Sequence, residues 1–161
     1  MIRAAIVGDP KKVPQYILSK FPEIQGACRT SMARLVLQLA RKIKEEKLSG
    51  QVLKNETGTL RRSITPSVSG TDTMAVGTVS TNVEYARIHE FGGKTSPHEI
   101  LPKRGRALAF EWKGQLVFFK KVQHPGSVFP ERSFMRSALE EMKPGIIDEF
   151  QNAIFEVIGR A

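Results

Sequence analysis

Apolar residues recur at helical spacing through the first third of the chain. Between residues 10 and 48 they follow one another at steps of three or four, which places them along one stripe of a helix. Pro22 lies within this stretch, where it either occupies the first turn of a second segment or kinks a single helix. The sequence Leu48-Ser49-Gly50 supplies a C-terminal stop, so we predict an N-terminal helical region over residues 10–48. The apolar stripe consists of Val13, Ile17, Phe21, Ile24, Cys28, Met32, Leu35, Leu39 and Ile43.

The pattern changes to that of β-strands in the middle of the chain. Residues 64–69 and 73–79 are short runs rich in β-branched side chains, joined by the turn sequence Ser-Gly-Thr-Asp. Residues 107–112 and 115–122 flank Lys113-Gly114, where glycine readily takes the positive φ of a tight turn. Each of these two pairs predicts an antiparallel hairpin.

Helical spacing returns after the second hairpin. One apolar stripe precedes Pro144, which interrupts it, and a second stripe continues from Ile146 to Ile158. This pattern predicts two helical segments within residues 131–160. The first stripe consists of Phe134, Ala138 and Met142.

The order of helix, then strands, then helix predicts the α+β fold class. We expect an antiparallel sheet built from hairpins over residues 57–128, packed by the long N-terminal helix and the C-terminal helices. A short helix over residues 83–91, ended by Gly92-Gly93, separates the two hairpins. A chain of 161 residues has the size of one ordinary domain, so we expect a single domain over residues 1–161.

The chain is strongly basic, and its charge is unevenly distributed. Residues 1–130 contain 21 basic and 10 acidic side chains, whereas residues 131–161 contain 4 and 6. Such a basic surface suits a polyanion such as DNA or an acidic protein partner, but it is equally the charge of an ordinary solvated surface. No apolar run reaches the length of a membrane span, and the first ten residues lack the long apolar segment of a signal peptide. We therefore expect a soluble protein made in the cytoplasm, with no membrane partner.

Residues that perform catalysis or bind metals do not occur in the arrangements that those functions require. The sequence Gly92-Gly93-Lys94-Thr95 resembles the end of a phosphate-binding loop, but Ile88 stands where the first glycine of that loop belongs. The three histidines lack the spacing of a zinc site, and the one cysteine, Cys28, falls on the apolar stripe of the first helix. We therefore expect neither an enzyme nor a bound cofactor or metal.

Three segments resemble motifs of the phage tail-completion and neck proteins, the group that includes minor tail protein Z of lambdoid phages and the virion-morphogenesis proteins of myophages. The first, Thr57-Gly58-Thr59-Leu60-Arg61-Arg62-Ser63-Ile64, is similar to the family's Thr-Gly-x-Leu-Arg-x-Ser-Ile element. The second, Tyr85-Ala86-Arg87-Ile88-His89-Glu90-Phe91-Gly92-Gly93, is similar to its Tyr-Ala-x-x-x-Glu-Phe-Gly element. The third, Pro130-Glu131-Arg132-Ser133-Phe134-Met135-Arg136, resembles Pro-x-Arg-Pro-Phe-Leu, with Ser133 replacing the usual proline and Met135 the usual leucine.

The resemblance implies a phage structural protein of the virion, made in the cytoplasm of the bacterial host, that acts in tail completion or head–tail joining. It implies assembly with copies of itself into a ring, expected to be hexameric, at the head-proximal end of the tail. The further partners that it implies are tail-tube, tail-terminator or head-completion proteins, with non-specific contact to packaged DNA. The alternative, suggested by the charge, is a basic nucleic-acid-binding module, although the sequence has no stacking aromatic series or recognition-helix motif.

The first motif is expected to form a turn at Thr57-Gly58 and to place Leu60 and Ile64 in the core. Arg61 and Arg62 are adjacent and would face apart in an extended chain, so one of them could reach a neighbouring subunit or DNA.

The second and third motifs supply candidate anchors. Tyr85 and Phe91 are expected to be core or interface anchors, because aromatic side chains bury large areas. Glu90 could pair with Arg132, either within the subunit or across a ring contact. Phe134 is expected to be buried and to anchor the final helix against the sheet, and Pro130 would rigidify the start of that helix.

A projecting hairpin over residues 101–126 is the candidate contact for DNA or a protein partner. Repeated around a ring, its positive charges would multiply a weak attraction for phosphate without base recognition, and they would equally suit an acidic protein surface. We expect this hairpin to become ordered on contact with its neighbours. The candidate basic residues are Arg62, Arg104, Arg106, Lys113, Lys120 and Lys121.

Overall fold

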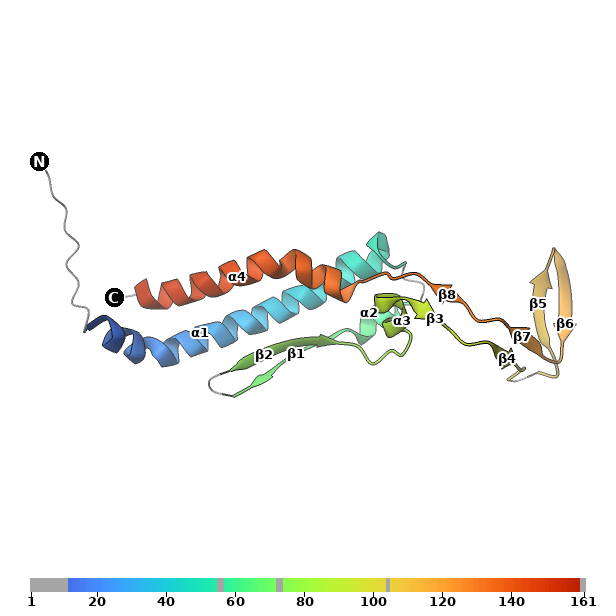
Figure 1. Ribbon diagram of the computed structural model, residues 1–161, viewed down its shortest axis with the longest axis horizontal. Coiled ribbons are helices and arrows are strands. Elements are labelled where there is room, and N and C mark those ends of the chain that lie inside the picture. The colour runs from blue at the N-terminus through green and yellow to red at the C-terminus, as the bar shows by residue number, and fades with distance from the viewer. Residues whose placement is uncertain (1–11, 55–56, 72–73, 104, 160–161) are drawn as a thin grey trace, which may run out of the picture. The chain divides into compact units, whose positions relative to one another are not determined.

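A computed structural model describes residues 12–54, 57–71, 74–103 and 105–159, and it confirms the α+β fold class (Figure 1). The helical elements are α1 (Lys12–Lys42), the π-helical segment η1 (Ile43–Gln51), α2 (Thr59–Ser63), α3 (Ala86–Phe91) and α4 (Met135–Gly159). The strands are β1 (Thr65–Gly70), β2 (Ala75–Ser80), β3 (Gly93–Lys94), β4 (His98–Ile100), β5 (Leu108–Trp112), β6 (Gln115–Phe119), β7 (Val122–His124) and β8 (Val128–Phe129).

Contacts divide the described residues into two compact units. The first, which we call the helical unit, lies within Met1–Val83 and Phe134–Ala161 and contains the long helices and the β1–β2 hairpin. The second, the arm unit, spans Glu84–Ser133 and contains α3 and the other six strands. That the two units together form a single domain remains a prediction.

Helices α1 and α4 pack side by side and antiparallel in the helical unit (Figure 1). The hydroxyl of Tyr16 donates a hydrogen bond to the carbonyl oxygen of Ile158 at 2.8 Å. Further along α1, the guanidinium of Arg34 lies 2.6 Å from a carboxylate oxygen of Glu149. As residue numbers rise along α1, the numbers of the residues that they contact fall along α4. Polar contacts therefore fix the antiparallel alignment at several points along the two helices.

The β1–β2 hairpin packs on α1, on a different side from α4 (Figure 1). Its antiparallel register pairs Thr65 with Ser80 and Gly70 with Ala75. Gly77 of β2 faces the helix, and a β-carbon at this position would lie only 2.2 Å from Cγ2 of Val36 and 2.6 Å from Sδ of Met32. The missing side chain therefore lets the strand approach α1 closely.

The apolar core occupies the C-terminal half of the predicted stripe rather than its whole length. Ile43 is 1% exposed, whereas Ile17 and Phe21, nearer the start of α1, are 42% and 49% exposed. The predicted burial of Leu60 and Ile64 is confirmed. The other buried apolar residues of the helical unit include Leu35, Val36, Ala40, Leu48, Leu53, Phe134, Ala138 and Val157.

The predicted helix end at Gly50 is confirmed, whereas Pro22 and Pro144 do not interrupt their helices. Gly50 leaves the helical conformation with φ 123°, and the N–H groups of the next residues cap the segment, as the sequence predicts. Pro22 lies inside the continuous helix α1, and Pro144 lies inside α4, so one C-terminal helix runs where the sequence predicted two segments. A proline removes its own N–H hydrogen bond. Contacts of Glu141 and Glu149 with α1, on either side of Pro144, hold α4 in line.

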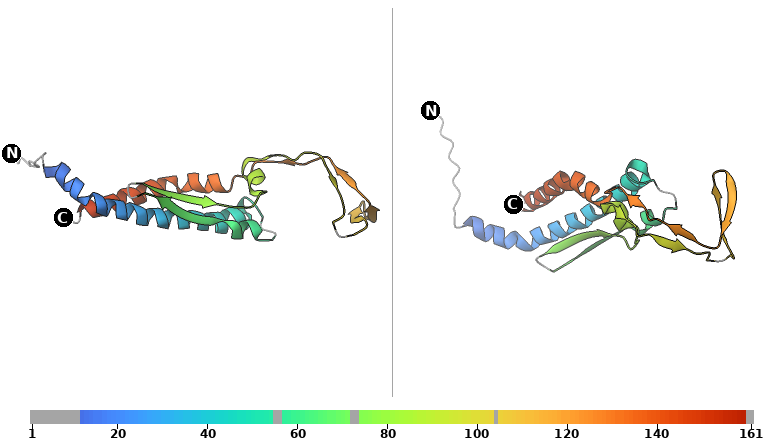
Figure 2. Two further views of the ribbon diagram at one scale, coloured as in Figure 1. Left: turned by 90° about the horizontal axis from the view of Figure 1, so that it is seen from below. Right: turned by 45° about the vertical axis from the view of Figure 1, so that its right-hand side comes forward.

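The arm unit is built from two chain segments that pair with each other three times in succession. Strand β3 pairs with β8, β4 with β7 and β5 with β6, all antiparallel (Figure 2). At the tip, Lys113 and Gly114 have φ values of 51° and 79°, as a two-residue type I′ turn requires. The second predicted hairpin is thus confirmed.

Within the described residues, every strand pairs with one partner, so the strands form four two-stranded ladders. The sequence predicted one sheet over residues 57–128. Strands β1 and β2 both contact α1, and the remaining strands pair only along the arm. Helix α1 therefore covers a hairpin and not a larger sheet.

Candidate functional site

The first motif forms a compact turn leading into α2. Gly58 precedes the helix with φ 74°, and its carbonyl oxygen accepts a hydrogen bond from the backbone N–H of Arg62 at 2.9 Å. The Arg62 guanidinium also donates to the carbonyl oxygen of Thr57 at 3.1 Å. The predicted turn is confirmed, but Arg61 and Arg62 lie in a helical turn and not in an extended chain. Both arginines are exposed, and the Arg62 side chain is used in this local hydrogen bond.

The end of the same motif ties α2 to the segment after β2. The hydroxyl of Ser63 lies 2.6 Å from that of Thr81, and it donates to the carbonyl oxygen of Leu60 at 2.8 Å. Leu60 and Ile64 are both buried on either side of it. Leu60, Ser63 and Ile64 therefore stabilise the helical unit, whereas Arg61 is exposed on its surface.

The second and third motifs meet at a buried carboxylate in the arm unit. Glu90 of α3 is 5% exposed and accepts a hydrogen bond from the hydroxyl of Ser133 at 2.8 Å. The backbone N–H of Arg132 donates to the carbonyl oxygen of His89 at 2.8 Å, and its side chain is exposed. The ion pairs among the described residues do not include one between Glu90 and Arg132; the hydroxyl of Ser133 reaches the carboxylate. Pairing across a ring contact stays a prediction.

The contact of Ser133 with Glu90 gives a physical reason for the serine that replaces the usual proline of the motif. A proline has no hydroxyl and could not donate to the Glu90 carboxylate. A buried carboxylate is costly unless hydrogen bonds satisfy its oxygens. The serine therefore adds a donor for Glu90 that the usual proline lacks, and the sequence pattern alone did not reveal this pairing.

Three rings connect α3 to the strand β8. Tyr85 packs edge-to-face on His89, with ring centroids 6.0 Å apart, and His89 packs in the same way on Phe129 at 5.9 Å. Tyr85 is nevertheless 45% exposed and Phe91 is 58% exposed, so the expectation that they are core anchors is wrong and the expectation of interface anchors remains. The role of His89 was missed, although its spacing of four residues from Tyr85 was a visible signal.

The glycine that ends α3 is required by a close approach of two backbone segments. Gly92 has φ 67°, and a β-carbon there would lie 2.9 Å from the backbone nitrogen of Glu131 and 3.1 Å from the carbonyl oxygen of Phe129. The second and third motifs are thus joined through backbone contacts at Gly92. In this region Ala86 is buried, Pro130 is exposed, and Phe134 has no exposed surface, as predicted for a core anchor.

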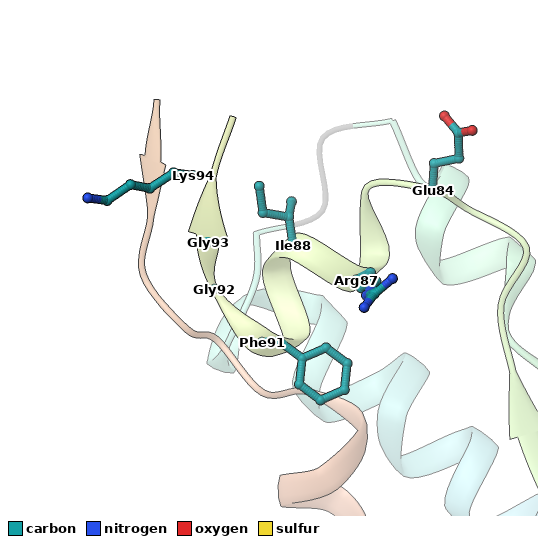
Figure 3. Close-up of a pocket in the computed structure, with 7 residues that line it drawn as sticks. All are labelled: Glu84, Arg87, Ile88, Phe91, Gly92, Gly93 and Lys94. Atoms are coloured by element: carbon teal, nitrogen blue, oxygen red, sulfur yellow. The ribbon is translucent and has the colours of Figure 1, made fainter. Parts of the chain in front are cut away.

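Exposed side chains of α3 and β3 border an open surface hollow (Figure 3). Figure 3 shows the labelled side chains pointing in different directions and not toward a common centre; the Lys94 side chain extends away from the Phe91 ring. Such a surface suits contact with another macromolecule better than enclosure of a small molecule. The lining residues are Glu84, Arg87, Ile88, Phe91, Gly92, Gly93 and Lys94.

The basic side chains of the arm differ in how far they are neutralised. Lys121 pairs with Glu99 on the neighbouring segment, with Nζ 3.0 Å from Oε2. Arg106, Lys113 and Lys120 are exposed, and the ion pairs found in the part of the chain that the structure describes do not involve them. Arg104 lies outside the described residues. The hairpin therefore presents positive charge that its own strands do not balance.

The β5–β6 hairpin exposes apolar side chains on both of its faces. The register places Phe110 opposite Val117 on one face and Ala109 opposite Phe118 on the other. Trp112 is 61% exposed, and Leu116 and Phe118 are each 65% exposed. The motif-based prediction did not include these residues. Their signal was the unbroken apolar run from residue 116 to 119, because a strand with one solvated face alternates apolar and polar residues.

A network of charged side chains lies in the helical unit. Lys47, only 3% exposed, pairs with Glu141 of α4, and Lys42 Nζ lies 3.1 Å from the other carboxylate oxygen. Hydrogen bonds from Lys47 first, and from Lys42 second, hold the pKa of Glu141 below its usual range. Hydrogen bonds to Glu46 first, and to Glu141 second, raise the pKa of Lys42. This network joins α1, η1 and α4 and serves the fold.

Across the described ranges, histidine, cysteine and acidic side chains do not gather in groups of three or more that could hold a metal ion. None of the helices, over the same ranges, combines the length and the apolar character needed to cross a membrane.

Comparison with known proteins gave one match. The model of the phage virion morphogenesis family matches residues 32–161 of the chain. No curated protein and no solved structure matched. The matched range includes all three motifs, the arm and α4, and it begins within α1.

Proposed function

The chain belongs to the phage virion morphogenesis family, and from this premise we propose that it is a ring-forming subunit at the head-proximal end of the phage tail. There it completes the tail or joins it to the DNA-filled head. Its partners in this role are other copies of itself, expected in a hexameric ring, and tail-tube, tail-terminator or head-completion proteins.

The observation that carries this proposal is the surface of the arm unit. A structural subunit needs exposed anchors that are satisfied only after assembly. Phe91 of the second motif is 58% exposed, and the tip of the arm exposes apolar residues on both faces. Large exposed apolar side chains grouped in this way mark interaction surfaces. Side chains that point in different directions around the α3 hollow agree with contact between subunits.

Deletion and complementation in the phage test this function. In the absence of the gene, we expect complete heads and tails to accumulate unjoined, and plaque formation to fall by several orders of magnitude. Electron microscopy would count joined particles, and the wild-type gene supplied in the host would restore them. Joined, infective particles formed without the protein would contradict the proposal.

A nucleic-acid-binding role is the second candidate, favoured by Arg106, Lys113 and Lys120 on the exposed hairpin. Phosphate contacts of this kind give an affinity that falls steeply with salt and does not depend on base sequence. Titration of duplex DNA at several salt concentrations measures it. Replacing the three basic side chains with glutamine should reduce the salt slope by about one for each phosphate group that the protein no longer neutralises.

A further inference from the structure

The tip of the arm cannot cover its own apolar surface. Phe118 and Leu116 lie on one face of the β5–β6 hairpin, and each is 65% exposed. An isolated two-stranded hairpin is at best marginally stable in water, because it has no layer against which to bury side chains. A second surface that covers Phe118 and Leu116 would therefore stabilise the hairpin.

The segment that contains this hairpin has a net charge opposite to that of α4. Residues 101–126 contain six basic side chains and one acidic one. Helix α4 contains two basic and five acidic side chains. Glu141 and Glu149 pair with α1 and Glu140 pairs with Lys143 of α4 itself, but Asp148 is exposed to solvent. The solvent-exposed side of α4, which we call its outer face, is therefore an electrostatic complement to the hairpin.

The outer face of α4 also carries exposed apolar residues. Ile147 is 55% exposed and Phe155 is 68% exposed, and they are two steps of four residues apart, which places them on neighbouring parts of one helix face. Eight residues of helix span about 12 Å. The five residues of β6 span about 17 Å, so one strand is long enough to reach both apolar side chains.

We propose that the β5–β6 hairpin of one copy docks on the outer face of α4 in a second copy. Phe118 and Leu116 pack against Ile147 and Phe155, with the lysines of the hairpin beside the carboxylates of α4. The inference rests on the proposed function, which brings several copies together. The contact joins two different surfaces, so it is heterologous and can close into a ring.

A second copy fits this surface better than DNA does. Phosphate groups would attract the lysines of the hairpin but would leave Phe118 and Leu116 exposed. The outer face of α4 satisfies both the charge and the apolar side chains.

Sedimentation velocity over a concentration series tests the contact with Phe118→Ser and Phe155→Ser. We expect each substitution to weaken self-association at least about tenfold, because each removes an apolar anchor from the centre of the contact. The double variant should self-associate as strongly as the more affected single variant, to within about twofold, because both substitutions break the same contact. The matched control is Leu37→Ser, which removes an exposed apolar side chain from α1 and should change association by less than about twofold. Circular dichroism of the four variants, compared with the wild type, establishes that they fold.

Crosslinking shows whether the contact joins two copies. Isotope-labelled and unlabelled chains are mixed and treated with a zero-length reagent that couples amines to carboxylates. We expect links from Lys113 or Lys120 to Asp148 that connect a labelled chain to an unlabelled one. Links confined to chains of one isotope would show that the hairpin docks on its own α4, which overturns the proposal.

Three other results would also overturn the proposal. They are a chain that stays monomeric over the whole concentration series, self-association unaffected by Phe155→Ser, and DNA binding abolished in Phe118→Ser while self-association is kept. Failure of this contact is separable from failure of the proposed function. If Phe155→Ser supports normal joining of heads and tails while deletion of the gene abolishes it, the function stands and this contact does not.

Discussion

The helical unit and the arm unit differ in how fully they bury their apolar side chains, although both leave some of them exposed. In the helical unit, Phe134 and Ala138 have no exposed surface, and carboxylates of α4 pair with cations of α1. In the arm unit, Phe118 and Leu116 are 65% exposed, and each strand has one partner strand. The helical unit therefore contains a buried core and ion pairs that stabilise it, whereas the β5–β6 hairpin of the arm unit leaves its large apolar side chains exposed.

The largest expected effect compares one phenylalanine from each unit. Phe134→Ala should lower the free energy of unfolding by about 3 to 5 kcal/mol, because it leaves a cavity in the core. Phe118→Ala should change it by no more than about 0.5 kcal/mol, because the ring is exposed. Urea denaturation followed by circular dichroism measures both. Equal losses in the two variants would mean that the difference between the units is not real.

A smaller effect is expected where β2 approaches α1. Gly77→Ala places a β-carbon against Val36 and Met32, and overpacking of this kind costs about 1 to 3 kcal/mol. Ser67→Ala, on an exposed position of the partner strand, is the control and should stay within about 0.5 kcal/mol. Thermal unfolding compares the two variants. If Gly77→Ala is as stable as the control, the hairpin does not depend on close contact with the helix.

The next prediction concerns Glu90, the buried carboxylate of the arm unit. Ser133→Ala removes a donor from Glu90 and should cost about 1 to 2 kcal/mol, since a buried acceptor loses a hydrogen bond. Ser133→Thr keeps the hydroxyl and should stay closer to the wild type. Hydrogen exchange of the α3 amides measures the effect within the arm unit itself. Unchanged exchange in Ser133→Ala would argue that the other contacts of Glu90 are sufficient.

The smallest expected effect is a dependence on pH in the helical unit. Hydrogen bonds from Lys47 and Lys42 lower the pKa of Glu141 in the folded chain. The contribution of this carboxylate to stability is therefore complete above the usual carboxyl range and is lost as the pH falls through the lowered folded value. Because Glu141 is half exposed, solvent screens the interaction and keeps the effect modest.

Melting temperatures measured from neutral to acidic pH test this dependence. The loss of stability in acid should be less steep in Glu141→Gln than in the wild type. Glu45→Gln is the control, because Glu45 pairs with the exposed Arg41 and should leave the slope unchanged. An identical slope in all three proteins would show that Glu141 does not couple folding to pH.

Local patterns in the sequence were sufficient for the elements and for part of the candidate site. Helical spacing indicated α1 and the C-terminal helix, and Lys113-Gly114 identified the turn at the tip of the arm. The motif positions Leu60 and Phe134 were correctly expected in the core. These predictions succeed because the helical period and turn chemistry depend on neighbouring residues.

Burial and pairing of the remaining site residues could not be predicted in this way. Phe91 was expected as a core or an interface anchor; its exposure excludes the core, and the interface role stays a prediction. The hydroxyl that reaches Glu90 comes from Ser133, 43 residues later in the chain. A periodic pattern shows which residues share a face, but it does not show what lies against that face.

The sequence by itself determined that this chain has long amphipathic helices, two hairpins and an excess of basic residues over residues 1–130, because composition, side-chain periodicity and turn propensity are properties of single residues and their near neighbours. Only the tertiary structure decided that α4 continues through Pro144 and that β3 and β4 pair with β8 and β7. Only the tertiary structure decided, too, that apolar side chains remain exposed along the arm. Those outcomes depend on contacts between residues far apart in the chain, whose free energy no local pattern contains.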